Sequence, residues 1–286
     1  MNHCFIDKCV ELSELHILRF LKRTQNACGT FRSNPFDSLR FFLLGYAFER
    51  QGSSRDFAAV ANEVILEASK EGKDFSSLKA KKIWNTFTKK LDEVKVKPNY
   101  ARNPLCPKGT EYTNNKDNTK TVNQKCVIEL VQEELSNVGI VSFAKEKLNS
   151  DQVKEAYEIL NKINGVGPKI ASLFLRDVAI VMCDCKKISN NKELLQPIDT
   201  WIRYCVRAYA GNTKLTYNEC ADFLINGTDE PEKANQGIWY FCAQVAQSSR
   251  YRVDRSIKDQ KYMERLIQQH IKDLKDDGEA GKSFRG

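Results

Sequence analysis

A lysine and an aspartate, each at the expected start of a helix, are the residues of this sequence best suited to chemistry. Lys169 closes the stretch Gly165–Lys169 (Gly-Val-Gly-Pro-Lys), and Asp199 follows thirty positions later, directly before Thr200. A lysine amine can act as a nucleophile where a helix dipole and partial desolvation favour its neutral form. A carboxylate can stabilise the positive charge that develops on a sugar when a glycosidic bond breaks. Each residue also has a plainer role, because Lys169 can simply bind phosphate and Asp199 can simply cap its helix.

The residues around Lys169 predict a tight turn between two helices. Apolar residues before the turn repeat at spacings of three and four: Val153, Ala156, Leu160 and Ile163. Residues 170–182 after it are apolar nearly all round. Gly165 and Gly167 permit positive φ and carry no Cβ, so backbone amides around Val166 can approach a phosphate oxygen. Pro168 suits the first turn of a helix, whose free amides attract anions. The stretch predicts a phosphate-binding turn, and an ordinary helix–helix turn with a glycine C-cap is the alternative.

The residues after Asp199 predict a second helix with Asp199 as its N-cap. Apolar side chains fall on one face of this helix: Ile198, Trp201, Ile202, Cys205, Val206 and Tyr209. Trp201 therefore belongs either to the core or to a binding pocket. The same periodicity favours the core for Tyr204 and for Phe174 in the earlier helix.

Positive charge is concentrated in one segment of the chain. The sequence has 45 Lys and Arg against 37 Asp and Glu, a net charge of +8. Between Lys73 and Lys125 there are thirteen basic and five acidic residues, and this difference of eight equals the whole excess. Such a segment favours a polyanion as partner, and a solvated helix face followed by a loop is the alternative.

Helical patterns dominate the chain, and strand patterns are nearly absent, which predicts an all-α protein. The expected helices cover residues 10–23, 36–50, 54–70, 76–93, 122–136, 151–163, 168–182, 199–210, 216–225, 231–247 and 256–275. Residues 97–123 are rich in Asn, Thr, Pro and Lys and predict a long loop. No apolar run is long enough for a membrane span or a signal peptide, so we expect an intracellular protein of the cytoplasm or nucleoid.

Cysteine and histidine spacing argues against a bound metal. Ten cysteines occur without any Cys-x-x-Cys pair, and the three histidines lie far from the motifs. Zinc and iron–sulfur ligation are therefore disfavoured, and we expect neither metal nor cofactor. Cys205 and Cys242 occupy apolar helical positions, as expected for small buried side chains in a reducing compartment.

The Gly165–Ala171 stretch, followed by Pro197–Thr200, resembles the helix-hairpin-helix DNA glycosylase superfamily, which includes endonuclease III and the 8-oxoguanine DNA glycosylases. The resemblance covers residues 34 to about 247. It places Lys169 at the position of the nucleophile of bifunctional members and Asp199 at that of the essential carboxylate. The interval between them is longer than in endonuclease III, with residues 177–196 as the insertion, and is closer to the archaeal 8-oxoguanine glycosylase branch. The iron–sulfur loop of endonuclease III is missing, and Trp201 replaces a histidine common in the family.

The resemblance implies two helical domains with the active site in a cleft between them. A six-helix barrel-like domain over residues 34–196 would carry the helix-hairpin-helix, and residues 1–33 and 197–286 would form the second domain. Gly165, Val166 and Gly167 would bind DNA phosphate, joined by Lys186 and Lys187 of the insertion. Gln51 and Arg55 are candidates for a wedge that fills the vacated base stack, and Trp201 for the base pocket.

The sequence therefore predicts a bifunctional DNA N-glycosylase and abasic-site (AP) lyase of base excision repair, acting as a monomer on double-stranded DNA with a damaged base. The expected substrate is 8-oxoguanine or another oxidised base. Two alternatives stay open. One is a non-catalytic helix-hairpin-helix DNA-binding module, in which Lys169 only binds phosphate. The other is a monofunctional glycosylase, in which Asp199 works with water.

Overall fold

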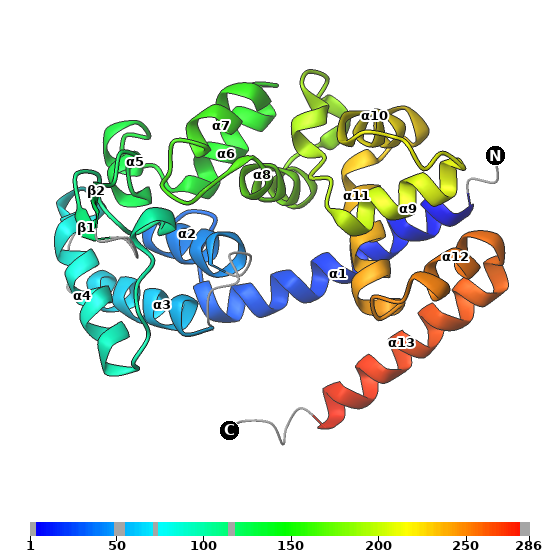
Figure 1. The fold of residues 1–286 in the computed structure, drawn as a ribbon, viewed down its shortest axis with the longest axis horizontal. Coiled ribbons are helices and arrows are strands. Elements are labelled where there is room, and N and C mark those ends of the chain that lie inside the picture. Colours follow the sequence, from blue (N-terminus) through cyan, green and yellow to red (C-terminus); the bar gives the residue numbers. More distant parts are fainter. Residues whose placement is uncertain (1–3, 49–54, 71–73, 114–117, 281–286) are drawn as a thin grey trace. The chain divides into compact units, whose positions relative to one another are not determined.

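The computed structural model describes residues 4–48, 55–70, 74–113 and 118–280, with the backbone alone for residues 4, 21–27, 55 and 276–280. It is mostly helical, in agreement with the all-α class (Figure 1). The helices are α1 (Cys4–Cys28), α2 (Pro35–Phe42), α3 (Arg55–Lys70), α4 (Ala80–Glu93), α5 (Val127–Glu133), α6 (Ile140–Asn149), α7 (Val153–Leu160), α8 (Pro168–Met182), α9 (Thr200–Ala210), α10 (Tyr217–Gly227), α11 (Pro231–Tyr240), α12 (Arg250–Lys258) and α13 (Gln260–Ala280). None of the described helices has both the length and the apolar character needed to cross a membrane.

The chain divides into two compact units. One is Phe20–Leu195, and the other combines Met1–Arg19 with Gln196–Gly286. The sequence placed the corresponding boundaries at residues 34 and 196. Helix α1 contributes residues to both units, because the division falls within it.

Helix α8 lies at the centre of the Phe20–Leu195 unit. Its Phe174 is fully buried and makes edge-on contacts with Phe42 and Tyr46, at ring-centroid distances of 5.0 and 5.2 Å. The Tyr46 hydroxyl donates a hydrogen bond to Asp177 Oδ2 at 3.1 Å. Arg176, also buried, donates to Asp177 Oδ1 at 2.8 Å. Buried charges need such partners, so these contacts fix the orientation of α8 within its unit.

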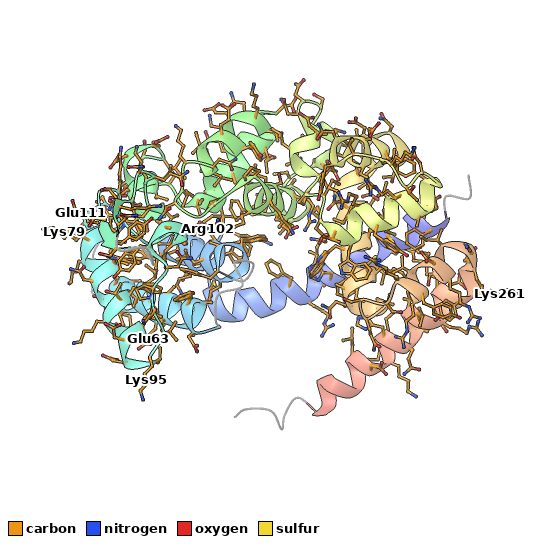
Figure 2. All side chains as sticks on the ribbon, in the orientation of Figure 1. Glu63, Lys79, Lys95, Arg102, Glu111 and Lys261 are labelled. Atoms are coloured by element: carbon orange, nitrogen blue, oxygen red, sulfur yellow. The ribbon has the colours of Figure 1, made fainter. Side chains whose placement is uncertain are left out.

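Helix α4 has an apolar face and a basic face. Its buried face consists of Ile83, Trp84, Phe87 and Leu91. On its other side Lys90 forms ion pairs with Glu63 and Glu67 of α3. Figure 2 shows Lys79 and Lys95 at opposite ends of this helix, with Glu63 on its neighbour. The lysines of the basic segment are thus of two kinds, those paired with carboxylates and those exposed to solvent.

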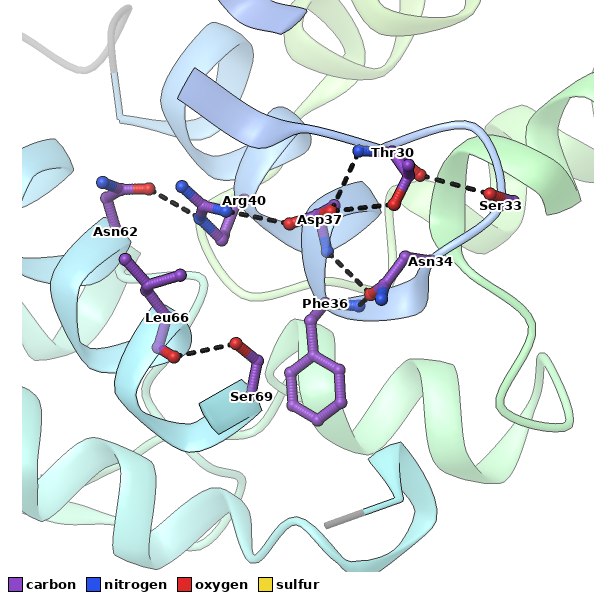
Figure 3. Close-up of polar contacts among 9 residues, drawn as sticks. All are labelled: Thr30, Ser33, Asn34, Phe36, Asp37, Arg40, Asn62, Leu66 and Ser69. Atoms are coloured by element: carbon purple, nitrogen blue, oxygen red, sulfur yellow. Dashed lines mark hydrogen bonds and ion pairs between the residues drawn. The ribbon is translucent and has the colours of Figure 1, made fainter. Parts of the chain in front are cut away.

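A polar network begins α2 and joins it to α3 (Figure 3). Asn34 caps α2, because its side-chain oxygen accepts from the backbone N–H groups of the first turn. Arg40 donates to Asp37 Oδ1 at 2.8 Å and to Asn62 of α3 at 2.7 Å. The other oxygen of Asp37 accepts from the backbone N–H of Thr30 at 3.0 Å. One buried guanidinium therefore ties the two helices and the preceding turn together.

Helices α1 and α11 approach closely in the second unit. A Cβ on Gly237 would lie 1.7 Å from the carbonyl oxygen of Cys9, so only glycine fits this contact. Nearby, the Ser13 hydroxyl donates to Gln236 Oε1 at 2.7 Å in the buried interface. The expectation that Cys205 and Cys242 are buried is confirmed, and both have no exposed surface.

The structure differs from the expected elements in three places. Residues 97–123, expected to be a loop, include a small antiparallel hairpin of β1 (Glu111–Thr113) and β2 (Thr119–Thr121), so a plain loop was wrong. Helix α6 was not expected, and residues 250–255 of α12 were also missed. Both α2 and α11 continue as π-helical turns, Leu43–Ala47 and Phe241–Val245.

The contact at Gly237 predicts a large difference between two glycine substitutions in neighbouring helices. Gly237→Ala should destabilise the protein by about 3 kcal/mol, because the new methyl group overlaps the backbone of α1. Gly227→Ala, where a Cβ would have nothing within 4 Å, should change the free energy of unfolding by less than about 1 kcal/mol. Urea unfolding of both variants measures this difference, and equal stabilities would show that α1 does not pack as closely as described.

Candidate functional site: the turn before α8 and the cap of α9

The turn between α7 and α8 requires glycine at one of its two glycine positions. Gly165 has a φ of +77°, and a Cβ there would lie 2.2 Å from the carbonyl oxygen of Arg102. Gly167 has a φ of −100°, and a Cβ there would meet nothing within 4 Å. Gly165 therefore adopts the positive φ that both glycines permit, and Gly167 does not. The space above Gly167 is open, as close approach of a ligand would require.

Asn164, which sequence reasoning missed, fastens this turn to the segment before α5. Its buried side-chain amide donates to the carbonyl oxygens of Tyr100 and Asn103, both at 3.0 Å. Its backbone N–H donates to the carbonyl oxygen of Lys125 at 2.8 Å. No periodicity reveals such a residue, since an Asn beside a glycine most often belongs to an exposed turn.

Some backbone N–H groups at the start of α8 have no carbonyl acceptor among the described residues. Gly167 is the N-cap, and the N–H groups of Ile170 and Ala171 donate to its carbonyl oxygen at 3.0 and 3.1 Å. Pro168 has no N–H, and within the described residues the N–H groups of Gly167 and Lys169 have no acceptor. Val166 is buried beneath the turn. Two backbone donors at a helix start can bind one anionic oxygen.

Lys169 is exposed in the first turn of α8. Among the residues that the structure describes, its amine has neither an ion pair nor a hydrogen-bond partner. Lys162, on the other side of the same turn, is in contrast paired with Glu134 at 2.7 Å. The two lysines of the turn therefore differ in availability, and Lys169 is the one whose amine can engage a ligand.

Asp199 caps α9, as the sequence predicted. Its Oδ1 accepts a hydrogen bond from the backbone N–H of Ile202 at 2.8 Å. The residue is half-buried, and its Oδ2 has no partner in the described part of the chain. One oxygen is thus held in place while the other can act. Lys169 belongs to the Phe20–Leu195 unit and Asp199 to the other, so each is positioned by its own unit.

The aromatic candidates have different environments. Phe174 is core, as the periodicity indicated. Trp201 is half-buried, packs at the edge of the core of its unit, and contacts Tyr204 edge-on at 6.1 Å. The Tyr204 hydroxyl is used by Asp254, to which it donates at 2.8 Å. Trp201 therefore retains an exposed part that can contact a ligand, whereas Phe174 does not.

The segment after α8 is held by an aspartate of the turn before α7. Asp151 accepts from the side chain of Ser189 at 2.6 Å and from that of Asn190 at 2.6 Å, and these bonds lower its pKa to about 2. Lys186 and Lys187 are exposed in this segment, and Lys187 lies 3.8 Å from Asp184. Of the two predicted wedge residues, Gln51 lies outside the described residues, and Arg55 begins α3 with its side chain outside them.

The described cysteines are packing residues. Burial raises the pKa of the Cys28, Cys106 and Cys183 thiols to about 11, so they are uncharged at neutral pH and weak nucleophiles. Over the described residues, no group of three or more His, Cys, Asp or Glu side chains is placed to hold a metal ion.

The geometry of the turn predicts that alanine substitution at its two glycines lowers the stability of the protein by very different amounts. Gly165→Ala should lower the free energy of unfolding by about 3 kcal/mol, since it combines a left-handed φ with a clash against the Arg102 backbone. Gly167→Ala should cost less than about 1 kcal/mol, because its φ is ordinary and its surroundings are open. Denaturant unfolding of the pair is the measurement. If Gly165→Ala were as stable as Gly167→Ala, the turn would not have the shape described.

Comparison with known proteins leaves the family of this chain open. No family profile and no solved structure matches it. An uncharacterized protein of Methanocaldococcus jannaschii, MJECL21, is 26% identical over 200 residues. The match covers 64% of this chain and 43% of the archaeal protein, so the chain spans less than half the length of that relative.

Proposed function

We propose that this protein is a bifunctional DNA N-glycosylase and AP lyase of base excision repair, with Lys169 as nucleophile and Asp199 as the assisting carboxylate. The observation that carries the proposal is the environment of Lys169. Its amine, which has no ion pair in the described part of the chain, belongs to the first turn of α8, where the backbone N–H groups of Gly167 and of Lys169 itself have no acceptor among the same residues. A nucleophile and an anion-binding site are thus adjacent, as a reaction on a DNA strand requires.

The turn from Gly165 to Lys169 would bind one phosphate of the DNA backbone. The N–H groups of Gly167 and Lys169 supply the donors, and the positive end of the α8 dipole adds to them. The open space above Gly167 leaves room for the phosphate. In this proposal α7, the turn and α8 form the helix-hairpin-helix of the larger domain.

The reaction begins with attack of the neutral Lys169 amine on C1′ of the damaged nucleotide. The new N–C1′ bond replaces the N-glycosidic bond, and the base departs with the bonding electron pair and takes up a proton. Opening of the sugar ring gives a Schiff base between Nζ and C1′. Loss of a C2′ proton then expels the 3′ phosphate by β-elimination, which nicks the strand.

Asp199 would act through the carboxylate oxygen that its cap bond leaves available. The hydrogen bond from Ile202 fixes Oδ1 and thereby orients Oδ2. A fixed anion beside the sugar stabilises the oxocarbenium character of the transition state without further reorganisation.

The damaged nucleotide must leave the duplex before either residue can reach it, at a cost of a few kcal/mol. The exposed part of Trp201 is the candidate wall of the base pocket, while Gln51 and Arg55 stay the predicted wedge. We propose an oxidised base such as 8-oxoguanine as the substrate. The protein would need no cofactor, because all the steps use side chains and water.

A non-catalytic DNA-binding module is the second candidate. It is favoured by the cap bond of Asp199, which gives that residue a structural role without any chemistry. In such a module Lys169 would hold phosphate only. A monofunctional glycosylase stands between the two, because Asp199 would then activate water and Lys169 would form no covalent bond.

Borohydride trapping on duplexes that carry an abasic site or 8-oxoguanine tests the nucleophile. The wild-type protein should give a covalent adduct with DNA, and Lys169→Gln should lose at least about 100-fold of the trapping rate, since no other amine replaces it. Lys162→Gln removes the paired lysine of the same turn and should trap at nearly the wild-type rate. A Lys169→Gln protein that still forms the adduct would falsify the assignment of this lysine.

Base release by Asp199→Asn tests the carboxylate. Asparagine keeps the cap, so stability should change little while the rate of base release falls by about 100-fold or more. Asp199→Ala is the control for the cap, and should in addition lose about 1 kcal/mol of stability. Release by Asp199→Asn at the wild-type rate would contradict the role of Asp199. Binding without release or nicking across a broad lesion panel would support the module instead.

A further inference from the structure

The basic segment before α5 is physically attached to the turn that precedes Lys169. We call residues 99–113 and 118–125 the basic strap. Its Arg102 carbonyl fills the space where Gly165 lacks a Cβ, and its Tyr100 and Asn103 carbonyls accept from Asn164. At its other end, Lys125 pairs with Ile163 in a parallel bridge. The strap is therefore held in register with the turn at both of its ends.

Aromatic contacts hold the strap on the side that faces α4. Tyr100 packs edge-on against Trp84 of α4 at 5.4 Å. Tyr112 of β1 stacks on Tyr100 at 5.6 Å, with ring planes only 6° apart. The β1–β2 hairpin, which carries Lys120, is thus attached to α4 through Tyr112 and Tyr100.

The cations of the strap are of two kinds. Lys125 is paired with Glu133 and Glu134, both at 2.8 Å. Arg102, Lys108 and Lys120 are exposed, and their side chains have no ion pair among the described residues (Figure 2 labels Arg102). The acidic neighbour of Lys108, Glu129, is already used, because its carboxylate accepts the backbone N–H groups of Lys108 and Cys126.

The rest of the exposed strap surface is polar. Thr113, Thr119, Thr121 and Asn123 are exposed on or beside the hairpin. Lys120 lies opposite Tyr112 in the ladder and therefore shares its face of the ribbon. Glu111 is the one exposed carboxylate of the described strap, and it lies opposite Thr121 and therefore on the other face of the hairpin from Lys120. The hydroxyl, amide and cationic donors of the rest, without an apolar patch, suit a phosphate backbone, whereas a peptide partner would bring apolar anchors.

We propose that the basic strap is a second DNA-backbone contact, in which Arg102, Lys108 and Lys120 bind phosphates of the duplex next to the phosphate held by the Gly165–Lys169 turn. The inference rests on the proposed function, because it takes duplex DNA as the partner. The turn grips one phosphate close to the reacting nucleotide, and the strap extends this grip along the strand. Since the backbone of the strap is tied to the turn through Asn164, the cations of the strap are attached at a fixed distance from the turn.

The salt dependence of binding to an undamaged duplex tests the strap. The slope of log K against log salt is negative. The triple variant Arg102→Gln, Lys108→Gln, Lys120→Gln should reduce its magnitude by about 2.7, or about 0.9 for each phosphate that is left without its cation. Between about 50 and 200 mM salt, the wild-type affinity should then fall roughly 40-fold more than that of the variant. The matched control, Lys79→Gln, Lys81→Gln, Lys89→Gln, removes the same charge from the exposed surface of α4 and should keep the wild-type slope.

Circular dichroism and urea unfolding establish that both triple variants fold, and each result then decides the inference. Equal slopes for the two variants would show a mere effect of net charge and would overturn it, as would an unchanged slope for the strap variant or stronger binding to duplex RNA than to duplex DNA. Borohydride trapping is scored separately. A strap-dependent slope without any adduct supports the strap and contradicts the proposed reaction, whereas an adduct without a strap-dependent slope does the reverse.

Discussion

The close approach of the Arg102 carbonyl to Gly165 is the constraint on which the candidate site depends. The contact leaves no room for a Cβ, and the left-handed φ of Gly165 turns the chain sharply enough to start α8 after two further residues. Asn164 completes the contact, because its side-chain amide donates to the Tyr100 and Asn103 carbonyl oxygens on either side of Arg102. The backbone around Arg102 thus shapes the backbone of the Gly165–Lys169 turn. That shape leaves the N–H groups of Gly167 and Lys169 without an acceptor among the described residues.

The turn is precise only because the helix behind it cannot move. Residues from Ile170 to Ala179 are buried throughout, and the Arg176, Asp177 and Tyr46 group gives α8 a polar anchor inside its unit. A side chain on the first turn of such a helix has a nearly fixed Cα position. Lys169 is therefore a flexible side chain on a rigid base, which is the arrangement that the proposed nucleophile would need.

How far the sequence predicted this arrangement depended on the range of the interactions involved. Local patterns were sufficient for α7, α8 and the Asp199 cap, since a helix face and a cap are decided within a few residues. They failed for β1 and β2, whose three-residue strands are too short for an alternating pattern. They also missed the role of Asn164, because the carbonyl groups to which its side chain donates lie some sixty residues away. Whether Lys169 and Asp199 act together is likewise a long-range property that no local pattern contains.

The ion pairs show which of the cations behind the net charge of +8 are available to a ligand. Lys90, Lys125 and Lys162 each contact glutamates, and hydrogen bonds from Lys125 and Lys162 lower the pKa of Glu134. A lysine whose charge is already balanced by a glutamate neutralises a phosphate poorly and displaces few of the counterions condensed on DNA, so it adds little to binding of a polyanion. Lys169 and Arg102, beside the turn, have no ion pair among the described residues, so their charges are available to neutralise a phosphate. One set of cations therefore joins helices through ion pairs. A second set, which includes Lys169 and Arg102, is left available to phosphate and lies next to the N–H groups of the turn that have no acceptor among the described residues.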